Sequence, residues 1–146
     1  SNLENLCRSM EGQYPDRVRA SIRYDATLAR RMYSSGDMLI MPSRYEPCGL
    51  TQMIAMRYGC IPIASATGGL CDTIKDNHNS ELSTGFLFKQ KTAGSLAQTL
   101  RRAIMLHQFN PSTWIKLQKN AMSADFSWEK SAMEYANLYL QLKGAI

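Results

Sequence analysis

Apolar side chains along the chain form one alternating segment and three short runs, which predict four β-strands. In Val18–Tyr24 apolar and polar residues alternate, as on a half-buried strand. Met38–Met41 and Cys60–Ala64 are continuous apolar runs, a pattern typical of strands buried on both faces. Gly85–Phe88 is expected to form a last, shorter strand.

Helical spacing of apolar residues predicts helices between and after these strands. Asp25 and Gly59 are placed to begin one helix and to end another, and Asn110 and Ser127 are placed to cap two later helices. A first helix is expected to end near residue 14, and a second to run from Asp25 to Ser34–Gly36. Two more are expected at about 50–58 and 68–74, and only helices are expected after residue 93.

Strands that alternate with helices argue for a parallel sheet in an α/β domain. The length of 146 residues suits one domain, and no internal repeat or second domain is evident. A complete doubly wound nucleotide-binding domain has about six strands, more than are predicted here. We therefore expect a truncated Rossmann-like parallel sheet with flanking helices and an all-helical C-terminal end.

The composition argues against several classes of protein. The formal charge of +5 comes from scattered Lys and Arg residues without interleaved aromatics, so we expect no nucleic-acid partner. No apolar run approaches the roughly 20 residues that span a bilayer, and the first residues lack the pattern of a signal peptide. The four cysteines have no C-x-x-C spacing, so we expect no metal and a reducing compartment.

Reactive side chains gather between Glu46 and Thr51, in the turn after the second predicted strand. Parallel α/β sheets bind ligands at the carboxyl ends of their strands, where this turn is expected. A carboxylate at Glu46 suits the binding of a sugar hydroxyl or the stabilisation of developing positive charge. The alternative is a surface ion pair, for example with Arg44, and the spacing leaves both interpretations open.

The helix after this turn is expected to begin near Gly49, Leu50 and Thr51. Unpaired N–H groups and the helix dipole favour an anion there, and the Thr51 hydroxyl is placed to donate to the same phosphate. Alternatively, Thr51 only caps or starts the helix. The two interpretations are compatible, because the same donors serve both.

Cys48 and the glycine pair Gly68–Gly69 complete the candidate residues of the two turns. A nucleophilic cysteine needs a base, but His78 falls in a polar loop and His107 on a helix stripe, so Cys48 is expected to line a pocket. The glycines permit close approach of a phosphate or sugar, although most such pairs mark only a tight turn. The sequence contains neither G-x-G-x-x-G nor G-x-x-x-x-G-K-[ST], which argues against dinucleotide dehydrogenases and P-loop ATPases.

Three ordered motifs are present: SRYEPCGLTQ at residues 43–52, AMRYG at residues 55–59 and TGGLCDT at residues 67–73. Together they resemble the bacterial glycogen synthase and plant starch synthase family. Weaker similarity extends from about residue 4 to residue 140, and DFSW at residues 125–128 resembles the segment before the family's last helix. The match is long and ordered, so we treat it as specific.

The resemblance implies a GT-B architecture and a retaining glucosyltransferase that moves glucose from ADP-glucose to the non-reducing end of an α-1,4-glucan. ADP-glucose would be the donor substrate, and no other cofactor is implied. The compartment would be the bacterial cytoplasm or the plastid stroma. Glu46 would be the active-site carboxylate at the donor sugar. The implied substrate-binding residues are Tyr24 at the adenine, Cys48 and Gly49 at the sugar, Leu50 and Thr51 at the diphosphate, and Gly68 and Gly69 at the donor glucose and phosphate.

Two parts of the pattern shared by such transferases are not in this sequence. Ile54 stands where many related transferases have a second glutamate, but the synthase branch commonly lacks that residue. A segment whose Arg and Lys bind phosphate does not occur either. We therefore expect residues 1–146 to be part of a C-terminal nucleotide-sugar-binding domain, with the N-terminal glucan-binding domain outside this chain.

Such a partial domain is expected to be inactive alone and to self-associate through its depleted sheet. One alternative is a related glycosyltransferase that uses UDP-glucose, since stacking on Tyr24 tolerates either base. Another alternative is a stand-alone nucleotide- or glucan-binding module. The Glu46 motif argues against the second alternative, because a pure binding module needs no active-site carboxylate.

Overall fold

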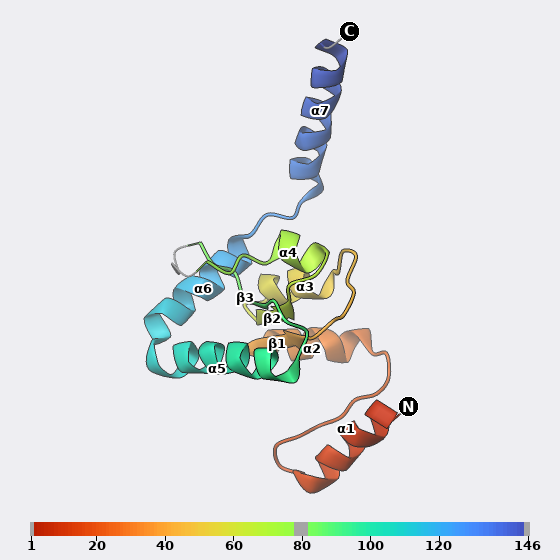
Figure 1. Cartoon of the computed structure of the whole chain (residues 1–146), viewed down its shortest axis with the longest axis vertical. Helices are drawn as coiled ribbons and strands as arrows, with labels where there is room; N and C mark the ends of the chain where they lie inside the picture. Colours follow the sequence, from red (N-terminus) through yellow and green to blue (C-terminus); the bar gives the residue numbers. More distant parts are fainter. Residues whose placement is uncertain (1, 78–81, 145–146) are drawn as a thin grey trace. The chain divides into compact units, whose positions relative to one another are not determined.

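The computed structural model describes residues 2–77 and 82–144 (Figure 1). The chain divides into two compact units, one ending at Arg30 and the other beginning at Arg31. The first unit carries helix α1 and the start of helix α2, and the second carries the sheet and the other helices.

Helices α1 (Asn2–Gln13) and α2 (Ala26–Ser35) confirm the first two predicted helices. Asp25 caps α2 as expected, since its Oδ1 accepts a hydrogen bond of 2.9 Å from the Leu28 N–H. Its Oδ2 lies 3.4 Å from Arg23 Nη2 in a surface ion pair. No residue of either helix is buried, so capping rather than a packed core defines the local structure here.

Residues 18–24 do not form the predicted strand. A strand needs a neighbour to pair its backbone N–H and C=O groups, and the described residues of the N-terminal unit include no strand. The apolar side chains of residues 18–24 are also not buried, and Tyr24 is 96% exposed. The prediction of Val18–Tyr24 as a strand is therefore wrong, and the described sheet has three strands rather than four.

The C-terminal unit is built on a parallel sheet in the order β1–β2–β3 (Figure 1). The strands are β1 (Met38–Met41), β2 (Ile61–Ser65) and β3 (Phe86–Phe88). Met41 lies beside Ala64 in the register, so the carboxyl ends of the strands lie at one edge of the sheet. The α/β fold class and three of the predicted strands are confirmed.

The central strand β2 forms the core of the C-terminal unit, and all five of its residues are buried. Strands β1 and β3 pair with its two edges, and helices α3 (Thr51–Arg57), α5 (Ala93–Phe109) and α6 (Pro111–Ser123) contact it. Each large apolar side chain buried in this way contributes about 1.5–3 kcal/mol. The largest buried neighbours of the strand include Met56, Leu70, Trp114 and Leu117.

Strand β1 is less buried than its apolar sequence predicts. Among the described strands it pairs only with β2, so one of its edges has unpaired backbone groups. Ile40 is 44% exposed, whereas Met38 and Leu39 are partly buried against the core. The prediction that Met38–Met41 is buried on both faces is therefore wrong.

The predicted caps near the carboxyl end are confirmed. Asn110 Oδ1 accepts a hydrogen bond of 3.2 Å from the Thr113 N–H at the start of α6. Ser127 Oγ accepts one of 3.4 Å from the Lys130 N–H at the start of α7 (Trp128–Gly144). No residue of α7 is buried, so its aromatic side chains are not core residues.

Gly59 and the short helix α4 (Gly69–Thr73) also follow the prediction. Gly59 has a φ of 77° and ends α3, which glycine does without strain. The polar loop expected around His78 lies partly outside the described residues, and His78 itself lies wholly outside them. Within residues 2–77 and 82–144, the helices fall short of the length and apolar character that a membrane-spanning segment requires.

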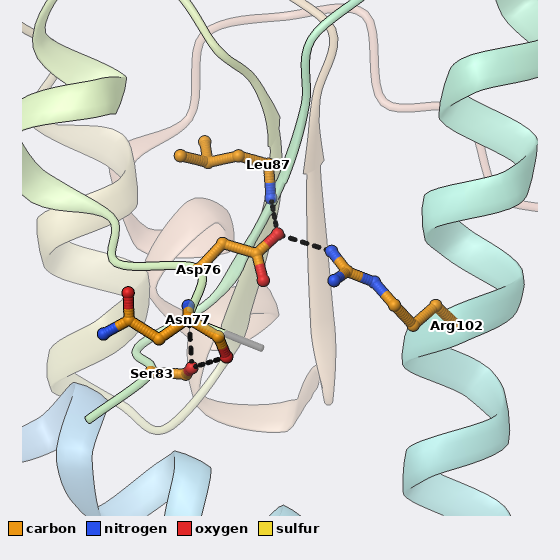
Figure 2. A network of polar contacts seen from close by, with 5 residues as sticks. All are labelled: Asp76, Asn77, Ser83, Leu87 and Arg102. Carbon is orange, nitrogen blue, oxygen red and sulfur yellow. Dashed lines mark hydrogen bonds and ion pairs between the residues drawn. The ribbon is translucent and has the colours of Figure 1, made fainter. Parts of the chain in front are cut away.

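A polar network joins the segment after α4 to β3 and α5 (Figure 2). Asp76 Oδ2 accepts a hydrogen bond of 2.8 Å from the Leu87 N–H and forms an ion pair with Arg102 Nη2. Ser83 Oγ donates to the Asn77 carbonyl at 2.8 Å and accepts from the Asn77 N–H at 3.1 Å. Asp76 thus links β3 to α5, because its largely buried carboxylate binds the Leu87 N–H of one and the Arg102 side chain of the other.

Candidate active site

The turns after β1 and β2 lie side by side at the carboxyl edge of the sheet, because the two strands are paired and parallel. We call residues 42–50 the Glu46 turn and residues 66–69 the glycine turn. Ligands of parallel α/β sheets bind at this edge. The structure therefore brings together every predicted site residue of the C-terminal unit.

The Glu46 turn and the glycine turn touch through their backbones. The Gly69 N–H donates a hydrogen bond of 3.0 Å to the Glu46 carbonyl. A Cβ atom at Gly68 would collide with the Glu46 carbonyl oxygen, and one at Gly69 would collide with the Cys48 carbonyl oxygen. Gly68 also has a φ of 47°, which other residues rarely adopt. The packing of one turn on the other thus requires both glycines, whether or not a ligand approaches them.

Two polar side chains, one from β2 and one from the segment after β3, hold the Glu46 turn in place. Ser65, buried at the end of β2, donates its hydroxyl to the Ser43 carbonyl. Lys91 follows β3, and its Nζ donates to the Arg44 carbonyl at 2.6 Å and lies 3.4 Å from Thr67 Oγ1. Lys91 therefore joins both turns. Sequence reasoning missed it, although its place just after the third strand was an available signal.

Glu46 is half-buried, and its Oε2 accepts a hydrogen bond of 3.4 Å from Ser43 Oγ. Among the described residues, the ion pairs do not include one between Glu46 and Arg44, the alternative that the spacing left open. An ionised carboxylate accepts about four hydrogen bonds, so most of this capacity is left for a ligand.

Helix α3 begins at Thr51, with Leu50 as its N-cap residue at φ −100° and ψ −26°. In the described part of the chain, no side chain caps its first N–H groups, so Thr51 starts the helix and does not cap it. Cys48 is exposed and Leu50 is 67% exposed, so this side of the turn faces solvent. Open N–H groups at a helix start attract anions.

Tyr24 belongs to the N-terminal unit, where its ring is 96% exposed. An exposed aromatic ring is free to stack on a planar ligand. Its role at an adenine stays a prediction.

Cys60, which is buried, and His107 on α5 both contact residues of the fold. Burial, and after it the Asp37 carboxylate, raises the pKa of Cys60 to about 11, which keeps the thiol protonated and inert. His107 Nε2 lies 3.6 Å from Asp37 Oδ1, and its ring meets the Trp114 ring edge-on at 5.0 Å. The described residues contain no group of three or more His, Cys, Asp or Glu side chains that could hold a metal ion.

A parallel sheet flanked by helices, with two turns that meet at its carboxyl edge, defines an α/β domain, the class whose ligands bind at that edge. Residues 9–120 match the family described as glycosyl transferases group 1. The chain therefore belongs to the group 1 glycosyl transferases, which agrees with the resemblance seen in its motifs.

Curated relatives point to one branch of this family. The glycogen synthase of Thermotoga petrophila is 44% identical over 137 residues, which make up 93% of this chain and 28% of that protein. The glycogen synthase of Anoxybacillus flavithermus is 45% identical over 141 residues, or 96% of this chain and 29% of that protein. The chain thus spans less than a third of the length of these relatives.

Solved structures share the fold. The catalytic domain of starch synthase IV from Arabidopsis thaliana, bound to ADP and acarbose, has a TM-score of 0.82 at 38% identity, over 94% of this chain and 29% of that chain. Sucrose-phosphate synthase from Thermosynechococcus elongatus has a TM-score of 0.63 at 34% identity, over 95% of this chain and 35% of that chain. These similarities confirm the predicted α/β fold of GT-B glycosyltransferases.

The contact between the two turns predicts different effects of alanine at two glycines. Gly69→Ala should lower the free energy of unfolding of this chain by about 1–3 kcal/mol, because the added Cβ meets the Cys48 backbone. Gly94→Ala in α5 is the control, because its Cβ meets nothing within 4 Å, and it should leave stability unchanged or raise it by up to about 1 kcal/mol. Urea unfolding measures both. Equal stability of the two variants would show that the turns are not packed as described.

Proposed function

We propose that this chain is the C-terminal nucleotide-sugar-binding part of a glycogen or starch synthase, a retaining glucosyltransferase that uses ADP-glucose. The acceptor is the non-reducing end of an α-1,4-glucan. The observation that carries the proposal is the joining of the Glu46 turn to the glycine turn at the carboxyl edge of the sheet. Both curated relatives described above are glycogen synthases, which supports the same branch.

Glu46 acts at the donor sugar in this proposal. Departure of a nucleoside diphosphate leaves positive charge on the sugar ring, as in an oxocarbenium ion. The half-buried carboxylate has spare acceptor capacity and is suited to stabilise that charge. Cys48 and Gly49 are within three residues of Glu46 and line the sugar pocket.

The diphosphate is held at the start of α3. The negative charge that develops on the leaving group is stabilised by donors already pointing at it, at little reorganisation cost. The Leu50 N–H and the Thr51 hydroxyl are the proposed donors at this end of the helix. Gly68 and Gly69, whose backbones already touch the Glu46 turn, approach the donor glucose and phosphate from the second strand.

Adenine is the proposed base of the donor nucleotide. Starch synthase IV, which shares the fold, was solved with ADP bound. The exposed ring of Tyr24 would stack on the base. A related transferase that uses UDP-glucose is the second candidate, because stacking on a tyrosine tolerates either base.

The glucan-binding domain and the phosphate-binding cations are proposed to lie in a longer protein, outside this chain. Support comes from the relatives, of which the chain spans less than a third. The chain alone is then inactive, since a GT-B active site lies between two domains. The longer protein would work in the bacterial cytoplasm or the plastid stroma.

Replacing Glu46 tests the catalytic assignment in the longer protein. Glu46→Gln should lower kcat by about 10²-fold or more, because the amide lacks the charge that stabilises the transition state. The thermal midpoint should hardly change, since Glu46 makes one long hydrogen bond of 3.4 Å. Glu134→Gln, at an exposed position of α7, is the control and should leave kcat unchanged. Near-normal turnover of ADP-glucose by Glu46→Gln would refute the assignment.

The isolated chain should bind ADP with a Kd weaker than about 1 mM, whereas the longer protein should bind it far more tightly. The reason is that the phosphate-binding Arg and Lys expected from the family are not in this sequence. Isothermal titration calorimetry with ADP measures both proteins. Micromolar affinity of the isolated chain would contradict the prediction.

The isolated chain should self-associate through the unpaired edge of β1. Ile40→Lys should reduce the association seen by light scattering over a range of concentrations, because charge on an exposed edge strand opposes pairing. Ile104→Lys is the control, since Ile104 is 37% exposed but lies on helix α5. A wild-type chain that stays monomeric at every concentration would argue against self-association.

A further inference from the structure

Gln52 is a fully buried polar side chain beneath the Glu46 turn. It is the second residue of α3 and is 0% exposed. Its Nε2 lies 2.8 Å from the Gly49 carbonyl, 3.1 Å from the Cys48 carbonyl and 3.1 Å from Thr73 Oγ1. An amide nitrogen has two hydrogens, so these three acceptors share its two donors.

Gln52 closes a ring of hydrogen bonds between the two turns. Thr73 Oγ1 accepts from Gln52 and donates to the Gly69 carbonyl at 2.7 Å. The Gly69 N–H in turn donates to the Glu46 carbonyl at 3.0 Å. The ring therefore runs from the Glu46 turn through α4 and back to Cys48 by way of Gln52.

The carbonyls that Gln52 holds determine where the neighbouring N–H groups point. In a trans peptide the C=O and N–H bonds point in opposite directions. Because the Cys48 and Gly49 carbonyls point inward to Gln52, the N–H groups of Gly49 and Leu50 point away from it. In the described part of the chain neither N–H has a hydrogen-bond partner, and Leu50 is 67% exposed.

The presence of a glutamine at position 52 is better explained by its hydrogen bonds than by the volume that it fills. Gln52 Oε1 is buried without a hydrogen-bond partner in the described structure, which lowers stability. An apolar residue of the same size would avoid that cost. Gly49 leaves room for the carboxamide, since a Cβ there would lie 2.5 Å from Gln52 Oε1.

We propose that Gln52 is a positioning residue that aims the N–H groups of Gly49 and Leu50 at the diphosphate of the donor, by holding the carbonyls of the same peptide groups from the buried side. This inference rests on the proposed function, because the diphosphate is the ligand assigned there. Two successive N–H groups turned to one side form a concave anion site, and Gly49, with a φ of 75°, permits that conformation. Donors fixed in advance stabilise the charge that develops on the leaving group, so Gln52 should affect kcat more than KM.

The test is Gln52→Met in the longer protein, with ADP-glucose as the donor. Methionine keeps the volume and loses both donors, so kcat should fall by about tenfold to a hundredfold while KM changes less. Gln118→Met is the matched control, because Gln118 Nε2 also donates to a backbone carbonyl, that of Gly59 at 2.9 Å. This control should lose stability but keep kcat. Equal kcat in the two variants would overturn the proposal.

A second variant separates donation from folding effects. In Gln52→Glu the ionised carboxylate cannot donate, whereas the protonated acid regains one donor. Burial raises the pKa of a carboxyl group, so the kcat of Gln52→Glu relative to wild type should rise as the pH falls from about 9 to about 5, while the ratio for Gln52→Met stays flat. A flat ratio for Gln52→Glu would overturn the proposal, even if Gln52→Met does not fold.

Amide hydrogen exchange gives a readout that does not depend on activity. Loss of the ring in Gln52→Met should speed exchange of the Gly69 N–H by about tenfold or more, with little change in Gln118→Met. If the wild-type protein does not transfer glucose from ADP-glucose, the proposed function fails, and the exchange data still test the ring. If wild type is active but Gly69 exchange and kcat are unchanged in Gln52→Met, only the role of Gln52 is refuted.

Discussion

The hydrogen bond from the Gly69 N–H to the Glu46 carbonyl is the contact on which the rest of the site depends. It joins turns that follow different strands, and it forms only because Gly68 and Gly69 have no Cβ to hold the backbones apart. Any ligand at the carboxyl edge of the sheet therefore meets one continuous surface made of both turns. The spacing of the proposed donor-sugar and diphosphate groups follows from this backbone contact.

The rigidity of this surface comes from the elements beneath it. β2 is buried along its whole length, and its last residue, Ser65, holds the Glu46 turn through the Ser43 carbonyl. Lys91 adds a contact from the segment after β3. Gln52 adds another from α3, below the turn. These hydrogen bonds all end on the Glu46 turn, so movement of that turn would disturb all of them.

Local patterns predicted the helices, the caps at Asp25, Asn110 and Ser127, and three of the strands, because capping and apolar runs act within a few residues. The failures were non-local. Val18–Tyr24 alternates like a strand but has no described partner to pair with, and Ile40 is exposed although it lies in an apolar run, on an edge strand of the described sheet. Pairing and cover depend on other segments, and a local pattern holds no information about them.

By itself, the sequence determined the family, the α/β class and the turn that carries Glu46, because ordered motifs and strand-to-helix alternation can be recognised without coordinates. Only the tertiary structure decided which atoms meet. It showed that the glycine pair serves packing of turn on turn, that Lys91 and Gln52 support the site, and that Arg44 does not pair with Glu46. The reason is physical: Gln52 and Thr73, or Lys91 and Arg44, are far apart along the chain, and only folding brings them within hydrogen-bond distance.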